Sequence, residues 1–260
     1  MGVKVNCELV KKEVIAEGIY KFTVKAPAIA EKAEAGQFLE IKVSKTGTPF
    51  LRRPISIYNI CKEEGLVEFI FQVKGEGTKL LAEENVGAEL DIMGPLGKGS
   101  FDIEGYKKVA IIGGGIGTYP LHELAKELYG NADVTMYMGF RTKDLVTLEK
   151  EFEAVSNRLV ITTDDGSYKE KGYAINFLKE DCQKEKPDMI YACGPLPMLK
   201  AVREFVIEEN IPCQVSLEER MGCGIGACLG CAVKIISGEE PRFGHVCKDG
   251  PVFNAKDVEI

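Results

Sequence analysis

Four cysteines near the end of the chain have the spacing of an iron–sulfur site. Cys223, Cys228 and Cys231 follow a C-x4-C-x2-C pattern, and Cys247 comes sixteen residues later. This is the plant-type spacing with which four thiolates hold a [2Fe–2S] cluster. Glycines alternate with the thiols, and a residue without a Cβ lets backbone N–H groups approach the cluster sulfurs. The pattern predicts that these four cysteines are the cluster ligands.

Zinc is the alternative metal for the same thiols. A zinc ribbon shows two C-x2-C pairs, whereas this segment has one such pair and a four-residue first gap. Thiols without any metal are the remaining interpretation. The other five cysteines fit no ligand pattern and are interpreted mainly as small buried apolar residues: Cys7, Cys61, Cys182, Cys193 and Cys213.

Length and composition restrict the class of protein. A chain of 260 residues predicts two domains with room for a small third. The net charge of −7 argues against binding to nucleic acid or to an anionic membrane. The sequence has neither an apolar run long enough to span a membrane nor the apolar start of a signal peptide. Nine cysteines without an export signal indicate a reducing, cytoplasmic location.

The first part of the chain, residues 3–91, has the pattern of a small antiparallel barrel. Residues 38–43 alternate in polarity, and residues 66–73 are rich in β-branched and aromatic side chains. Glycines separate such runs at turn-like intervals, and one short helix is expected at residues 78–84.

Two segments of this barrel carry groups that suit a phosphate. Arg52 and Arg53 offer planar guanidinium groups for a pyrophosphate, with the Ser56 hydroxyl downstream on the same strand. The turn Lys74-Gly-Glu-Gly-Thr78 leads into a helix, whose free N–H groups also suit an anion. Taken singly, these segments are better explained as a surface basic pair and an ordinary capped helix.

From residue 107 the pattern changes to alternating strands and helices, which predicts a doubly wound parallel sheet. Strands are expected at residues 109–112, 134–138, 159–163, 189–192 and 214–217. Helices are expected at residues 119–129, 144–155, 174–181 and 197–210.

A glycine-rich loop follows the first of these strands, where such folds bind ligands. It comprises Gly113, Gly114, Gly115, Gly117 and then Thr118, which takes the place of the third glycine of the usual dinucleotide fingerprint. No acidic residue ends the next strand, so a standard Rossmann NAD site is not indicated. A tight strand–helix turn is the alternative interpretation.

The order of these segments resembles the ferredoxin-reductase superfamily. An Arg-Pro-x-Ser strand, a Gly-x-Gly-Thr turn and the closing Gly94-Pro-Leu-Gly97 carry the likeness. It implies FAD binding by Arg53, Pro54, Ile55, Ser56, Ile70, Phe71, Gln72, Gly77 and Thr78. Ile55 stands where the superfamily often has Tyr, so an aromatic partner for the flavin ring is missing there.

The same resemblance gives the glycine loop a role in binding NAD. It implies that the turn Cys193-Gly194-Pro195 lies over the nicotinamide, with Cys193 beside the carbon that transfers hydride. Arg141 is expected at the adenosine half of the nucleotide. Ser56 and Cys193 are the predicted catalytic residues.

The tail, from Ser216 to Cys231 and then from His245 to Phe253, resembles the electron-transfer subunit of B-type dihydroorotate dehydrogenase. The resemblance implies a hetero-oligomer, a heterotetramer, with an FMN-containing catalytic subunit, whose electrons pass through the cluster and FAD to NAD⁺ in pyrimidine biosynthesis. Its modules would be residues 1–100 for FAD, 101–215 for NAD and 216–260 for the cluster.

Two other functions stay open on the sequence alone. One is the small subunit of an NADH-dependent ferredoxin:NADP oxidoreductase, which shares this architecture. The other is a zinc-binding scaffold without catalytic activity. His122 and His245 are interpreted as structural rather than catalytic.

Overall fold

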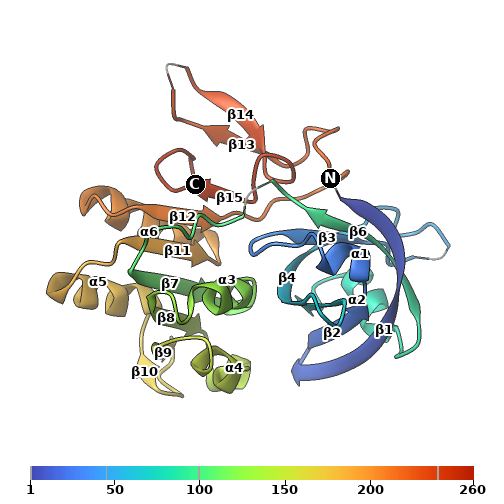
Figure 1. Cartoon of the computed structure of the whole chain (residues 1–260), viewed down its shortest axis with the longest axis horizontal. Coiled ribbons are helices and arrows are strands. Elements are labelled where there is room, and N and C mark those ends of the chain that lie inside the picture. The colour runs from blue at the N-terminus through green and yellow to red at the C-terminus, as the bar shows by residue number, and fades with distance from the viewer. Residues whose placement is uncertain (1, 45, 99, 239) are drawn as a thin grey trace. The chain divides into compact units, whose positions relative to one another are not determined.

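The computed structural model describes residues 2–44, 46–98, 100–238 and 240–260, which form two compact units (Figure 1). The barrel unit comprises the described residues up to Ser100 together with Glu218–Ala232 and His245–Pro251. The sheet unit comprises Phe101–Leu217 with the described residues of Val233–Gly244 and Val252–Ile260. The tail therefore contributes to both units.

Antiparallel strands close the barrel unit in the order β1-β2-β5-β4-β3-β6. The strands are β1 (Val3–Ala16), β2 (Ile19–Lys25), β3 (Phe38–Ile41), β4 (Arg53–Cys61), β5 (Leu66–Gln72) and β6 (Glu89–Leu96). The helices of this unit are α1 (Pro27–Ala30) and α2 (Glu76–Glu83). The closed barrel leaves none of these strands with an unpaired edge, which confirms the barrel predicted from the short alternating runs.

Aromatic and aliphatic side chains fill the barrel. The ring of Phe22 lies 5.1 Å from that of Phe71 and 5.7 Å from that of Phe69, centroid to centroid. From β3, Leu39 and Ile41 join this core. Since side chains alternate along a strand, the other residues of β3 point out of the barrel.

The sheet unit is the doubly wound fold that the alternating pattern predicts. The strand order is β10-β9-β8-β7-β11-β12-β15. The strands are β7 (Lys108–Gly114), β8 (Asp133–Phe140), β9 (Arg158–Thr163), β10 (Glu170–Lys171), β11 (Met189–Cys193), β12 (Cys213–Ser216) and β15 (Val252–Asn254). All pair in parallel except β15, an antiparallel edge strand from the tail that the sequence analysis did not predict.

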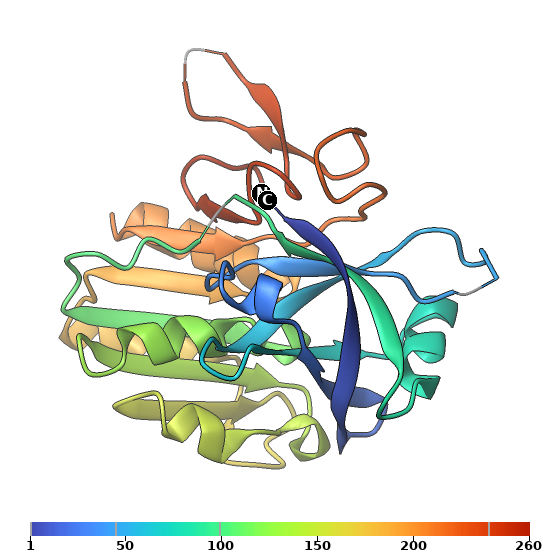
Figure 2. The same cartoon turned by 45° about the vertical axis from the view of Figure 1, so that its right-hand side comes forward.

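Helices cover both faces of this sheet, with α3 and α4 in front of it and α5 and α6 behind it in Figure 2. Their bounds are α3 (Leu121–Leu128), α4 (Glu149–Glu153), α5 (Ala174–Lys184) and α6 (Leu196–Glu208). Short 3-10 turns are η1 (Gly115–Thr118) and η2 (Lys143–Leu145), and β13 (Ala232–Ile235) pairs with β14 (Arg242–His245) in a two-stranded ribbon.

One predicted helix is broken in the structure. The sequence pattern predicts a continuous helix at residues 144–155, whereas the structure has η2, then Leu148 with φ 57°, then α4. A left-handed residue cannot continue a right-handed helix, so α4 begins only after Leu148.

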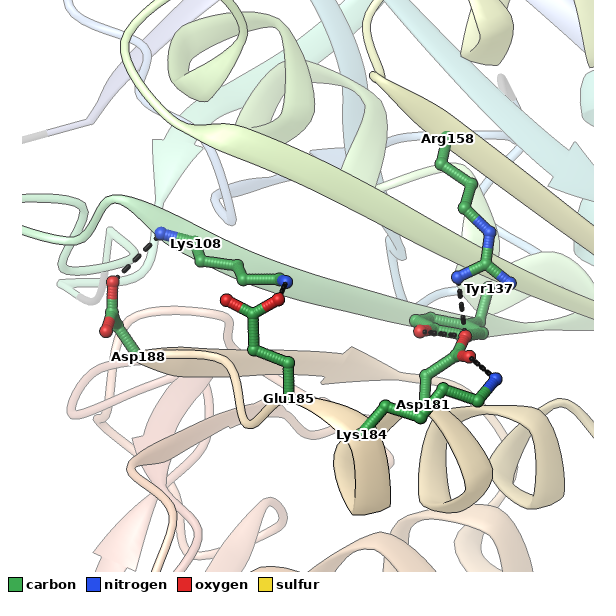
Figure 3. Close-up of polar contacts among 7 residues, drawn as sticks. All are labelled: Lys108, Tyr137, Arg158, Asp181, Lys184, Glu185 and Asp188. Carbon is green, nitrogen blue, oxygen red and sulfur yellow. Dashed lines mark hydrogen bonds and ion pairs between the residues drawn. The ribbon is translucent and has the colours of Figure 1, made fainter.

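Charged side chains join the sheet to α5 at the edge where β7, β8 and β9 begin (Figure 3). The Asp181 carboxylate accepts hydrogen bonds from Arg158 at 2.6 Å, Tyr137 at 2.9 Å and Lys184 at 3.1 Å. The Asp188 carboxylate accepts the backbone N–H groups of Lys107 and Lys108 at 2.8 and 2.9 Å. Asp181 thus links α5 to β8 and β9, and Asp188 links the segment before β11 to the start of β7.

Candidate redox sites

The predicted FAD residues of β4 and α2 lie together in the barrel unit. The Arg53 guanidinium packs so closely on Gly77 that a Cβ added to this glycine would lie 2.2 Å from Arg53 Nε. Gly77 is buried in the first turn of α2, where backbone N–H groups have no partner within the helix. The Arg53 guanidinium thus lies beside the N-terminus of α2, and the two together suit the binding of a pyrophosphate.

Thr78 holds the turn that leads into α2. Its hydroxyl accepts the N–H of Lys74 at 2.9 Å and of Gly75 at 3.2 Å, and donates to the Gly75 carbonyl at 3.0 Å. The hydroxyl is therefore committed to shaping the turn. What Thr78 offers to a phosphate is the backbone N–H of the first helical turn.

The other predicted flavin residues fall on neighbouring strands. Ser56 lies opposite Phe38 of β3 and is half-buried, as are Pro54 and Ile55. On β5, Phe71 belongs to the barrel core, so Ile70 and Gln72 point to the other side of that strand. The pairing of β4 with β5 is irregular between Ile57 and Asn59, and the buried Tyr58 lies within that irregularity.

The two predicted nucleotide loops of the sheet unit pack against each other backbone to backbone. Gly113 of β7 lies opposite Cys193 of β11 in the parallel register. A Cβ on Gly117 would lie 2.6 Å from the Cα of Gly194, and one on Gly114 would lie 2.8 Å from Pro195 Cδ. Only glycine allows this close approach of the two loops. Both motifs lie at the carboxyl ends of adjacent parallel strands, which is the edge where such a sheet binds ligands.

Three further predicted residues lie at this edge. Cys193 is buried with 1% of its surface exposed, and Thr118 is fully buried with no hydrogen-bond partner for its hydroxyl in the described part of the chain. Arg141 directly follows β8 and is exposed. The loop end after β8 is thus open to solvent, whereas the β7 and β11 turns are closely packed.

The four cysteines of the tail lie in the barrel unit as two neighbouring pairs. The N–H of Cys228 donates to Cys223 Sγ at 3.4 Å, and the N–H of Cys247 donates to Cys231 Sγ at 3.5 Å. Four thiolates in two pairs are the ligand set of a [2Fe–2S] cluster, with two thiolates for each iron.

Backbone N–H groups point at these sulfurs. Cys223 Sγ accepts from the N–H of Ala227 at 3.2 Å and of Cys228 at 3.4 Å, and Cys247 Sγ accepts from that of Gly226 at 3.2 Å. Burial raises the pKa of Cys223, but the hydrogen bonds to its sulfur outweigh burial and lower this pKa to about 6. Such N–H donors stabilise the thiolate that a cluster needs.

Glycine is required in this cluster loop, which we define as residues 222–231. Gly224 has φ 68° and Gly226 has φ 77°, both in the left-handed region that other residues avoid. Ile225 and Leu229 of the same loop are exposed by 54% and 78%. The backbone therefore turns toward the thiols while two apolar side chains face solvent.

Glu40 is a residue of this site that the sequence analysis missed. It points outward from β3, yet it is only 1% exposed because the cluster loop covers it: a Cβ on Gly224 would lie 2.8 Å from Glu40 Oε1. Neither carboxyl oxygen has a hydrogen-bond partner in the described residues. Burial raises the pKa of Glu40 to about 7, against the nearby charges of Arg52 and Arg53. The alternating pattern of residues 38–43 marked this face as polar but could not show what covers it.

The two histidines have structural surroundings. His122 is buried in α3, with its ring edge-on to Phe152 at 5.3 Å. The Nδ1 atom of His245 lies 3.5 Å from the Asp249 carboxylate, which also accepts the backbone N–H of His245 at 2.7 Å.

No helix in the part of the chain described here has the length and apolar character to cross a bilayer.

Known families match all three parts of the chain. Residues 6–101 match an oxidoreductase FAD-binding domain, residues 111–204 an oxidoreductase NAD-binding domain, and residues 218–259 the iron-sulfur cluster binding domain of dihydroorotate dehydrogenase B. A flavin, a nicotinamide nucleotide and an iron–sulfur cluster are thus the cofactors of this chain.

Relatives match over nearly the whole length. The dihydroorotate dehydrogenase B (NAD(+)) electron transfer subunit of Bacillus pumilus is 40% identical over 99% of this chain and 98% of its own. That of Geobacillus thermodenitrificans is 41% identical over 97% of both chains.

Solved structures share the fold. The structure of an NADH-dependent reduced ferredoxin-NADP oxidoreductase is 31% identical, with a TM-score of 0.86 over all of this chain and 91% of that one. A ferredoxin reductase of carbazole 1,9a-dioxygenase is 22% identical, with a TM-score of 0.68 over 81% of this chain and 67% of that one.

The barrel, the doubly wound sheet and the cysteine tail define an oxidoreductase with the ferredoxin-reductase fold. Within that class, the chain belongs to the family of electron-transfer subunits of NAD-dependent dihydroorotate dehydrogenase B.

Proposed function

We propose that this chain transfers electrons from the FMN of a dihydroorotate dehydrogenase catalytic subunit, through a [2Fe–2S] cluster and FAD, to NAD⁺ in pyrimidine biosynthesis. The observation that carries the proposal is that backbone N–H groups donate to the sulfurs of Cys223, Cys231 and Cys247, on a chain with FAD- and NAD-binding domains. When bound, FAD supplies the exchange between the electron pair of a nicotinamide and the single electrons of a cluster.

Residues of the chain take three roles in this proposal. Cys223, Cys228, Cys231 and Cys247 ligate the cluster. Arg53 and the first turn of α2, with Gly77 and Thr78, bind the FAD pyrophosphate, while Ser56 faces the flavin. The glycine loop and the turn Cys193-Gly194-Pro195 bind the nicotinamide nucleotide, with Arg141 at its adenosine half.

The electrons come from a partner protein. The relatives are named as subunits, and the exposed Ile225 and Leu229 of the cluster loop supply an apolar contact surface beside the thiols. We propose a heterotetramer with the FMN-containing subunit. The five cysteines outside the cluster set form no disulfide in the described structure, which supports a reducing cytoplasmic location.

A second function is the small subunit of an NADH-dependent ferredoxin:NADP oxidoreductase. The structural likeness at a TM-score of 0.86 favours a common architecture, while the identity of 31% is below the 40% shared with the B. pumilus electron-transfer subunit. The two functions differ in partner, since only the first receives electrons from an FMN-containing dihydroorotate dehydrogenase subunit.

Reconstitution tests the proposed function. The purified holoprotein is assayed for dihydroorotate-dependent NAD⁺ reduction alone, with the FMN subunit, and with an FMN subunit whose flavin has been removed. Activity is expected only with the intact FMN subunit, because electrons must enter from its flavin.

NADH and NADPH are compared in the same preparation by stopped-flow reduction of the bound FAD. Faster reduction by NADH is expected. Dihydroorotate oxidation by the isolated chain, or failure to bind the FMN subunit, would contradict the proposal. A clear preference for NADPH would favour the ferredoxin:NADP oxidoreductase function.

A further inference from the structure

A buried carboxyl group lies directly beneath the cluster loop. Glu40 is on β3, opposite Pro54 of the proposed FAD strand, and its outward side is covered by Gly224. Strand β3 thus pairs with the proposed flavin strand β4 through its backbone, and it contacts the cluster loop through the Glu40 side chain. Both contacts lie within the barrel unit.

No described hydrogen bond neutralises this carboxyl group. Both of its oxygens are buried without a partner among the described residues, although burying an unpaired polar group costs free energy. Arg52, the neighbour of the proposed FAD ligand Arg53, donates to the Asp91 carboxylate at 2.8 Å and to the backbone carbonyls of Asp91 and Glu40 at 2.9 and 3.3 Å. The guanidinium is thereby paired with Asp91 rather than with the Glu40 carboxylate.

The position of the carboxyl group relates it to the cluster. Gly224, against which Glu40 packs, directly follows Cys223, one of the proposed cluster ligands. Reduction adds one electron, and therefore negative charge, to a cluster. A nearby negative charge in a water-excluded site opposes that addition, since net charge and solvent exposure set cluster potentials.

We propose that Glu40 tunes the cluster electrostatically: its carboxylate, held against the backbone of the cluster loop, lowers the reduction potential of the cluster. This inference rests on the proposed assignment of the four cysteine ligands and extends it to a residue outside the motif. The group acts through the loop and through space rather than by ligation.

The test compares midpoint potentials in the full-length holoprotein. Glu40→Gln keeps the shape of the side chain and removes its charge. The titration is run at pH 8.5, which favours the ionised form of the wild-type carboxyl. EPR-monitored redox titration is expected to show reduction of the variant cluster favoured about tenfold, which is about 59 mV higher for a one-electron couple.

Glu89→Gln is the matched control. Glu89 is an exposed carboxylate of β6 in the same barrel, so its charge is screened by solvent and its removal should leave the potential unchanged. Iron, sulfide and FAD contents are measured first for every variant. An unchanged or lowered potential in cluster-loaded Glu40→Gln would overturn the inference.

A third variant covers the case in which Glu40→Gln does not keep its cluster. Glu40→Leu fills a similar volume without any polar group, and it should show the same upward shift of the potential. If both variants fold, bind FAD and lack the cluster, the carboxyl holds the loop in place and the tuning role is wrong. A wild-type chain without iron and sulfide would instead refute the cysteine assignment.

Discussion

At the scale of single residues, the proposed FAD site depends on a missing side chain as much as on a charged one. Arg53 reaches the first turn of α2 because Gly77 leaves the space that a Cβ would fill. The sequence motif identified both positions. It could not show that their contact is direct, because residues 53 and 77 are on different elements.

Arg53→Ala is expected to reduce the FAD content of the purified protein by tenfold or more. The lost bidentate contact to a phosphate pair is worth about 1.5–3 kcal/mol. Flavin absorbance per chain and iron content measure the effect. Lys62→Ala removes one positive charge from an exposed turn of the same barrel and should retain full FAD. Equal flavin content in the two variants would refute the role of Arg53.

Cys228→Ser is expected to abolish the stable cluster while leaving FAD bound. A serine hydroxyl loses its proton far less readily than a thiol and is the weaker ligand for cluster iron, so the iron held by Cys223 would be poorly bound. Iron and acid-labile sulfide per chain, with the visible spectrum, report the loss. Cys61→Ser, a half-buried cysteine outside the motif, should keep both cofactors. Stoichiometric zinc in anaerobically purified wild type would contradict the cluster.

At the scale of elements, apolar runs predicted the central strands β7, β8, β9, β11 and β12, because most residues of these strands are buried. The break at Leu148 could not be predicted, since no glycine or proline marks it. Nor could the edge strand β15, which has three residues and depends on its neighbour β12 for its hydrogen bonds. Local sequence carries little information about such a short pairing.

The carboxylate of Asp181 shows how one element holds another. It joins α5 to β8 and β9, and the hydrogen bonds from Arg158, Lys184 and Tyr137 outweigh its desolvation, so its pKa lies below the ordinary value (Figure 3). The folded protein thus binds this proton less readily than the unfolded chain does. The Asp181 carboxylate contributes fully to the free energy of unfolding above its unfolded-state pKa of about 3.9. This contribution is lost as the pH falls through its folded-state pKa.

Asp181→Asn should therefore lower the free energy of unfolding by about 1–2 kcal/mol at pH 7. The difference from wild type should shrink as the pH falls below about 3.9 and through the lowered folded pKa, because the wild-type carboxylate then becomes protonated. Urea denaturation at pH 7 and at pH 3 measures both values. Glu180→Gln, the adjacent exposed residue of α5, provides the control. A difference that stays constant with pH would show that charge is not the cause.

At the scale of the whole molecule, the motifs predicted the fold class, the cofactors and the family, because glycines and cysteines at fixed spacing report backbone geometry and ligand chemistry directly. The sequence could not predict how the tail divides. Part of it covers β3 of the barrel unit, while β15 completes the sheet of the other unit. Glu40 was missed for the same reason.

Leu229→Asp should weaken binding to the FMN subunit by tenfold or more, since an unpaired charge buried in an interface costs about 3–5 kcal/mol. The dissociation constant measured by calorimetry gives the effect, and cluster and FAD contents should not change. Val86→Asp is the control, because Val86 is 59% exposed on the barrel unit and lies outside the cluster loop. Equal affinities of the two variants would place the docking surface elsewhere.

The packing of the cluster loop on Glu40 of β3 also bears on the order in which the parts of the chain fold during synthesis. A ribosome releases the barrel strands first, whereas the segments that lie over Phe38 and Glu40 are among the last to emerge. Until then the Glu40 carboxylate is hydrated and costs nothing, and only the arrival of Gly224 removes its water. The newborn barrel can therefore fold as an ordinary antiparallel barrel, and the cost of the buried charge is met only when the cysteines arrive.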